Sequence, residues 1–208
     1  MKQKDFELAA DVKLAEITTV AIPLCFGDPR DPNDGCHDRF ETAIKDLIPR
    51  HTLVIQTGGN DSLPLCDLMY EVLKKNRPDW TSQFLPFIIG WGTRSEIVAA
   101  FALIRLLADK RIDGERLNTQ SSEFRVVISS NKAHLRRIKW YVKIHNISHL
   151  PVEYREAKHY FSFKDTLREW VGIYLIILKD KFVGVKNVHE KEMVGFWSKI
   201  LSQEWLQF

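Results

Sequence analysis

The alternation of short apolar segments with segments of helical period constrains this chain more than any other feature of its sequence. Five apolar runs of strand length are each followed by a stretch in which apolar residues recur every three or four positions. Short apolar strands separated by helices pair in parallel through right-handed crossovers, which place helices on both faces of the sheet. The pattern therefore predicts a doubly wound, three-layer αβα sandwich with a mainly parallel sheet of about five strands.

The expected strands end at clusters of Gly, Pro, Ser or Asn, which break regular structure. We expect strands at 17–26, 52–57, 84–89, 124–128 and 152–155. We expect helices at about 37–48, 65–75, 95–108, 133–145 and 164–181. The first of these helices is expected to place Phe40, Ile44, Leu47 and Ile48 on one face. The chain is predicted to form a single α/β domain, 1–208, in which 186–208 is a C-terminal helical tail.

Composition excludes several classes of protein. With 208 residues and 45% hydrophobic residues, the chain is long and apolar enough to bury a core without disulfide or metal staples. A formal net charge of +3 is far from the clustered basicity of nucleic-acid-binding proteins. The longest apolar stretch, 170–178, is about half of the roughly 20 residues that span a bilayer. We therefore expect neither a nucleic-acid partner nor a membrane span.

The N-terminal segment and the cysteines indicate a cytoplasmic protein. Charged residues interrupt every window before Ile17 that could form the apolar region of a signal peptide. The three cysteines are odd in number and show no CxxC spacing, which favours reduced thiols over a disulfide framework.

An apolar stripe follows the helical period near the C-terminus, through Val194, Trp197, Leu201 and Trp205. Such a stripe packs either on its own domain or against a second copy of the chain. The second alternative makes the tail a homodimer contact.

The segment after the fourth expected strand carries the clearest candidates for chemistry. In doubly wound sheets, ligands bind outside the carboxyl ends of the strands, where the strand order reverses. His134 lies in the first helical turn after such a strand end, where it can donate to an anion or shuttle a proton. Arg137 follows one turn later and can grip a phosphate or carboxylate. The alternatives are a helix-capping histidine and a surface arginine.

A set of short motifs resembles the YdcF/SanA/ElyC family over roughly residues 17 to 185. The motifs are Arg39 with Ala43, the run Val54-Ile55-Gln56-Thr57-Gly58-Gly59, Thr93 at a helix start, and Val127-Ile128-Ser129-Ser130 with His134 and Arg137. The resemblance implies a Rossmann-like sheet whose motifs converge on one crevice. It also implies a link to bacterial envelope biogenesis, in a family with a member reported to bind S-adenosylmethionine.

The position of each residue at a strand end or helix start, taken together with the resemblance, leads to expected roles. His134 is expected to be the catalytic general acid or base. Substrate-binding residues are expected at the family positions and the strand ends, namely Arg39, Gly58, Gly59, Asn60, Thr93, Glu96, Ser130 and Arg137. Glu96 departs from the family, which has asparagine there, and we expect its carboxylate to neutralise an arginine or to hold a ribose hydroxyl or metal ion.

The function expected from these residues is binding of a small anionic metabolite: a nucleotide, a phosphate ester or S-adenosylmethionine. Group transfer or hydrolysis linked to envelope or glycan metabolism would use the same parts. The alternative is a non-catalytic ligand sensor or scaffold that acts through its C-terminal apolar helix. No metal is expected, since aspartates such as Asp28, Asp31 and Asp34 in a Pro- and Gly-containing loop are typical turn formers.

Overall fold

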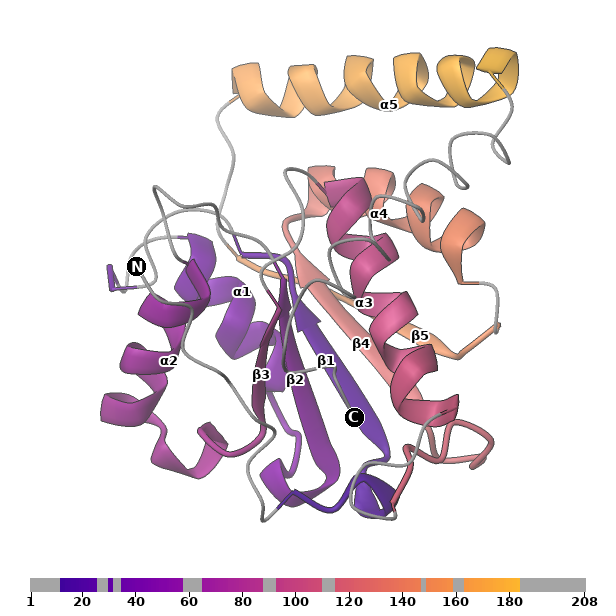
Figure 1. The fold of residues 1–208 in the computed structure, drawn as a ribbon. Helices are drawn as coiled ribbons and strands as arrows, with labels where there is room; N and C mark the ends of the chain where they lie inside the picture. The colour runs from indigo at the N-terminus through magenta and orange to yellow at the C-terminus, as the bar shows by residue number, and fades with distance from the viewer. Residues whose placement is uncertain are drawn as a thin grey trace.

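Five parallel strands form the sheet of the computed structural model, in the spatial order β3-β2-β1-β4-β5 (Figure 1). The structure describes residues 12–25, 30–31, 35–57, 65–87, 93–109, 115–146, 149–158 and 163–183. The strands are β1 (Thr19–Pro23), β2 (Thr52–Thr57), β3 (Phe84–Phe87), β4 (Arg125–Ser130) and β5 (Val152–Glu156). The predicted α/β sandwich with a five-stranded, mainly parallel sheet is confirmed.

Two layers of helices cover the sheet. The helices are α1 (Gly35–Ile44), α2 (Leu65–Asn76), α3 (Thr93–Asp109), α4 (Lys132–His145) and α5 (Phe163–Val183). Three short 3₁₀ segments are η1 (Leu14–Glu16), η2 (Pro49–His51) and η3 (Pro78–Trp80). Figure 1 shows α1 and α2 on one side of the sheet and α3 and α4 on the other. This division follows from the strand order, because right-handed crossovers in opposite directions along a sheet place their helices on opposite faces.

The core consists of two apolar clusters, one on each face of the sheet. Val20 and Ile22 of β1 belong to the cluster under α3 and α4. Ala21, between them, belongs to the cluster under α1 and α2, because successive side chains of a strand point to opposite faces. Both faces of β1 are therefore buried, which explains why the strand reads as a continuous apolar run.

Helix α5 lies across the carboxyl-end edge of the sheet, beyond α4 (Figure 1). Its 21 residues make it the longest helix in the described part of the chain. Within that part, no helix combines the length and the apolar character needed to cross a membrane. The predicted tail at 186–208 lies outside the described residues.

Some element boundaries differ from the sequence-based expectations. The first strand was expected to continue to residue 26, but β1 ends at Pro23, and the Cys25 amide donates to the Pro23 carbonyl at 3.0 Å. The first helix ends at Ile44, because Asp46 has a positive φ of 59° that breaks the helix. The expected position of Ile48 on the buried face is therefore wrong, and Ile48 is 62% exposed.

Candidate functional site

The candidate site lies where β1 and β4 are neighbours, which is where the strand order reverses. From this point the chain runs outward to β2 and β3 on one side, and to β5 on the other. Ligands of doubly wound sheets bind at such a reversal, outside the carboxyl ends of the strands. Four elements contribute the polar side chains: Arg39 from α1, Ser130 from β4, Thr93 from α3, and both His134 and Arg137 from α4.

His134 is the centre of the hydrogen-bond network in this site. Its Nδ1 lies 3.1 Å from Ser130 Oγ, and its Nε2 lies 2.7 Å from Thr93 Oγ1 and 2.9 Å from Arg137 Nη2. Its backbone N–H donates to Oδ1 of Asn131, the N-cap residue of α4, at 2.9 Å. The imidazole is therefore held on both nitrogens, and the residue is 9% exposed.

The hydrogen-bond partners of His134 define its tautomer. A guanidinium group can only donate, so Nε2 must be the acceptor when it bonds to Arg137 Nη2. The ring proton then lies on Nδ1, which donates to Ser130 Oγ. Arg137 Nη2 also donates to Thr93 Oγ1 at 3.3 Å, leaving the Thr93 hydroxyl hydrogen to point at Nε2. Among the described residues, a neutral imidazole satisfies all of these hydrogen bonds, whereas a second ring proton at Nε2 would lose the bond from Arg137 Nη2.

Burial and charge shift the pKa values of His134 and Glu96 in opposite directions. Burial, together with the positive charges of Arg137 and Arg39, lowers the pKa of His134 to about 3. Burial raises the pKa of Glu96 to about 7, although the same two arginines act to lower it. At neutral pH, His134 is therefore neutral, while the Glu96 carboxyl is close to its titration midpoint.

Glu169 of α5 is a site residue that the sequence-based reasoning missed. Its Oε1 lies 3.1 Å from Arg137 Nη2, and the residue is only 8% exposed. The sequence held part of a signal, because Glu169 lies four positions before Ile173 and seven before Ile176, at helical spacing along the face that the structure shows turned toward the protein. An acidic residue on the apolar, inward face of a helix indicates a buried charge partner.

The ion pair between Arg137 and Glu169 leaves two polar atoms without partners among the described residues. These atoms are Arg137 Nε and Glu169 Oε2, and both are buried. Buried polar atoms without partners are costly and rare in folded proteins. Nε and Nη2 form the fork with which arginine binds planar anions. The Nε donor of Arg137 therefore has no hydrogen-bond partner among the described residues.

Arg39 braces the strand ends beneath the site. It is 2% exposed, and its Nη1 donates to the Leu24 carbonyl at 2.7 Å, just beyond the end of β1. The hydroxyl of Ser129 donates to the Arg39 carbonyl. Arg39 therefore has a structural role in addition to the electrostatic one, since its charge acts on the pKa values of both His134 and Glu96. Its predicted contact with substrate stays a prediction.

Part of the predicted site lies outside the described residues. Gly58, Gly59 and Asn60 belong to this part, immediately after Thr57 at the end of β2. Asp28 and Asp34 of the first loop are also outside, and Asp31 is exposed. In the chain segments that the structure describes, no group of three or more His, Cys, Asp or Glu side chains could hold a metal ion.

The arrangement favours binding over proton transfer. A hydroxyl hydrogen-bonded to an imidazole, as Thr93 is to His134, is the pattern used to activate a nucleophile. An effective general base, however, has a pKa near the working pH, whereas that of His134 is about 3. The clustered arginine, hydroxyl and imidazole groups instead form a preorganised set of hydrogen-bonding partners.

The fold and this cluster together define a Rossmann-like α/β protein with a polar site at its topological switch point. No protein-family model, curated protein or solved structure matches the chain. The resemblance to the YdcF/SanA/ElyC family therefore stays a prediction that rests on the motifs alone.

Proposed function

We propose that this protein binds a small anionic metabolite between the carboxyl ends of β1 and β4. The observation that carries the proposal is the network in which Arg137, Thr93 and Ser130 surround a neutral, buried His134. A nucleotide, a phosphate ester and S-adenosylmethionine all present anionic oxygens that suit such a site. The sequence also favours a cytoplasmic location, and in the described part neither Cys25 nor Cys36 is in a disulfide.

Charge and hydrogen-bonding capacity support an anion at this place. Arg137 has a buried Nε with no hydrogen-bond partner among the described residues, and this atom can donate to an anionic oxygen. The positive ends of α3 and α4 lie at Thr93 and Lys132, at the same edge of the sheet. Protonation of Glu96, whose pKa is about 7, would remove a competing negative charge when an anion binds.

Catalysis is the second step of the proposal. Group transfer or hydrolysis, linked to envelope or glycan metabolism, would use His134 as general acid or base. A bound dianion stabilises the imidazolium form, so it raises the pKa of His134 from its low ligand-free value. In this proposal, His134 becomes an effective general acid or base only when the anionic ligand is bound.

A non-catalytic sensor or scaffold is the alternative function. The observation that favours it is the apolar outer face of α5, where seven large hydrophobic residues are exposed. Exposed apolar patches of this kind mark interaction surfaces. In this alternative, the site at the switch point holds a ligand but does not transform it.

A panel of nucleotides, phosphate esters and S-adenosylmethionine distinguishes the two functions. Thermal shift reports binding, and product formation reports turnover, in the wild type and in His134→Gln. Turnover that is lost in His134→Gln supports an enzyme, whereas a thermal shift without turnover supports the sensor. A panel in which no anion raises the melting temperature would contradict both.

A further inference from the structure

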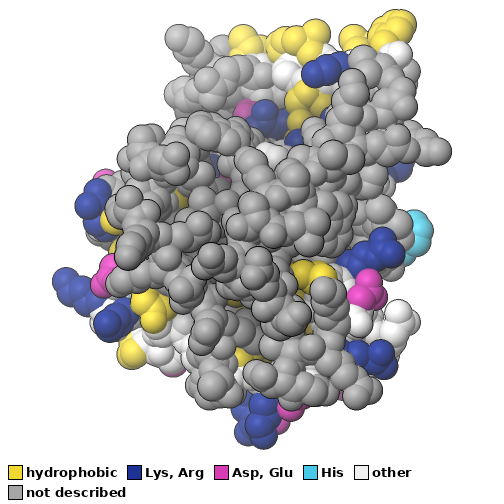
Figure 2. Space-filling view, in the orientation of Figure 1, with side chains coloured by type: hydrophobic (Ala, Val, Ile, Leu, Met, Phe, Trp, Pro, Cys, Tyr) yellow, Lys and Arg dark blue, Asp and Glu magenta, His cyan; other side chains and the backbone are white. Residues whose placement is uncertain are grey.

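Nearly all exposed large hydrophobic side chains in the described part of the chain lie on one helix. Apart from Ile48, they all belong to α5, and their exposure ranges from 41% to 87%. They are Leu167, Trp170, Val171, Tyr174, Leu175, Leu178 and Phe182. We name this set the α5 outer stripe, and Figure 2 shows hydrophobic side chains gathered along the corresponding edge of the molecule.

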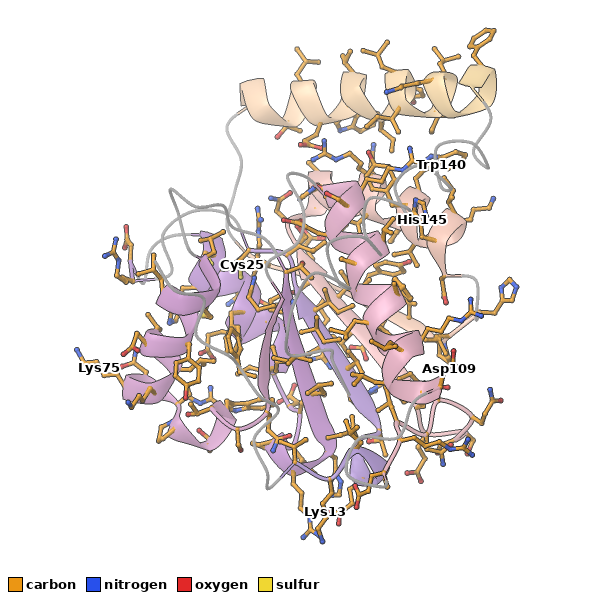
Figure 3. The ribbon with its side chains drawn as sticks, viewed as in Figure 1. Lys13, Cys25, Lys75, Asp109, Trp140 and His145 are labelled. Carbon is orange, nitrogen blue, oxygen red and sulfur yellow. The ribbon has the colours of Figure 1, made fainter. Side chains whose placement is uncertain are left out.

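Apart from Trp170 at its edge, whose ring lies 3.7 Å from the guanidinium carbon of Arg136 on α4, the outer stripe is not the face by which α5 packs on its own domain. The inward face carries Glu169, which pairs with Arg137, together with the buried Ile173. At 100° per residue, Glu169 and Ile173 fall on the side of the helix opposite the centre of the outer stripe. In Figure 3, side chains project from α5 away from the rest of the protein. The helix is therefore anchored on one side and presents a separate apolar surface on the other.

Six of the seven residues of the outer stripe are placed symmetrically about the point between Tyr174 and Leu175. Reversing the helix about this point exchanges Leu167 with Phe182, Val171 with Leu178, and Tyr174 with Leu175. In an antiparallel pair about a two-fold axis, residue i of one copy meets residue j of the other and j meets i, so this spacing places apolar side chains against apolar side chains. We propose that a second copy of this chain covers the outer stripe, with the two α5 helices packed antiparallel about a two-fold axis at this point.

The pattern within the stripe matches helix-to-helix packing. Leu167, Val171, Tyr174 and Leu178 are separated by four, three and four residues, which is the spacing of a coiled-coil seam. Trp170 and Leu175 lie at the sides of this seam. The same reversal brings Lys179 of one copy toward Trp170 of the other, whose ring already has Arg136 of its own chain over it at 3.7 Å.

The size of the stripe is adequate for a dimer. Seven large side chains with these exposures supply on the order of 800 Å² per copy, about the contribution of each partner to a standard protein–protein interface. A monomer would leave this area in water, where large apolar patches are uncommon. The interface differs from the one expected from the sequence, which used the C-terminal tail.

Light scattering during gel filtration of the full chain tests the proposal. We expect the wild type to have twice the mass of one chain at micromolar concentrations. The double variant Leu175→Glu and Leu178→Glu should have the mass of one chain, because it places four carboxylates beside the two-fold axis. Ile48→Glu is the matched control, since it changes an exposed hydrophobic residue outside α5 and should leave the dimer intact.

Chemical crosslinking keeps the test decisive if the double variant fails to fold. Tyr174→Cys lies beside the proposed axis, so a short bismaleimide should join two copies of it. Ile48→Cys should give no more crosslinked dimer than the wild type. A wild-type monomer would overturn the proposal, whether lipid or residues 184–208 of the same chain cover the stripe instead. A dimer that survives the double substitution, or equal crosslinking at positions 174 and 48, would also overturn it.

Discussion

His134 is a residue whose surroundings hold it neutral. Arg137 can only donate to Nε2, and burial opposes a second proton on the ring. The residue thus links a strand end, a helix start and an arginine without adding charge to the site. Its resting role is to position the Thr93 hydroxyl and the Arg137 guanidinium.

The low pKa of His134 makes protein stability depend on pH. In the unfolded chain the imidazole takes up a proton below about pH 6.5, but in the folded protein its pKa is about 3. Between these values the unfolded state binds more protons, so this contribution to stability is complete above pH 6.5 and falls as the pH falls. We expect a loss of up to about 1.4 kcal/mol per pH unit in the free energy of unfolding.

Urea denaturation at pH values from 7 to 4 measures this effect. His134→Gln retains hydrogen-bonding groups without a titratable ring, so its stability should fall less steeply than that of the wild type over this range. Equal slopes for the two proteins would show that the pKa of His134 is near its ordinary value in the folded state.

Glu96 should make anion binding pH-dependent near neutrality. Its pKa of about 7 means that the carboxyl gains negative charge as the pH rises from 6 to 8. Sulfate is a suitable probe because it stays a dianion in this range. We expect its affinity to fall as the pH rises, by up to about tenfold for each unit by which sulfate raises the pKa of Glu96. In Glu96→Gln the sulfate affinity should vary less with pH than in the wild type. The same pH profile in both proteins would show that Glu96 does not act on the bound anion.

At the scale of a single element, helix α5 shows what the apolar period predicts and what it does not. Its apolar period predicted a helix at 164–181, and the structure has Phe163–Val183. The period alone did not reveal which face meets the protein, because apolar residues occur on both sides of the helix. The rule that site residues follow the carboxyl ends of strands also could not find Glu169. Glu169 lies within α5, which comes after the last strand and crosses the edge of the sheet.

Glu169 and Arg137 couple the position of α5 to the charge of the site. In Glu169→Gln, the Arg137 guanidinium is no longer neutralised by a buried carboxylate. We therefore expect sulfate to bind several-fold more tightly, with a steeper dependence on salt, because screening acts on the uncompensated charge. Glu71→Gln is the control, since Glu71 is an exposed acidic residue on α2. Unchanged sulfate affinity in Glu169→Gln would show that the ion pair has only a structural role.

At the scale of the whole molecule, the alternating pattern predicted the architecture because the strands are short, mostly apolar except for β5, and followed by helices with an apolar face. The strand order then brings Thr93, Ser130, His134 and Arg137 together, although they are up to 44 residues apart. Their convergence was predictable from the rule that parallel strands end at one edge. The network around His134 was not, since it depends on side-chain geometry that no periodicity encodes.

Contacts across the whole molecule also explain why strand β4 is longer than expected. Ser129 and Ser130 read as a turn, and the strand was expected to end at residue 128. Both serines are nevertheless buried and paired with β5, opposite Arg155 and Glu156. Tertiary pairing outweighs local propensity here. The longer strand has a functional consequence, because it places the Ser130 hydroxyl against His134.

The most direct test of the account is a calorimetric titration with sulfate, phosphate and adenosine monophosphate as probes. The informative variant is Arg137→Gln combined with Glu169→Gln, because it removes the anion-binding arginine without leaving a buried carboxylate unpaired. Lys143→Gln is the control, since Lys143 is an exposed cation further along α4. We expect the wild type and the control to bind at least one probe equally well. The double variant should bind it more weakly by about 1.5 to 3 kcal/mol, the range for a charged hydrogen bond. Equal binding by the double variant, or no binding of any probe by the wild type, would contradict an anion site at the switch point.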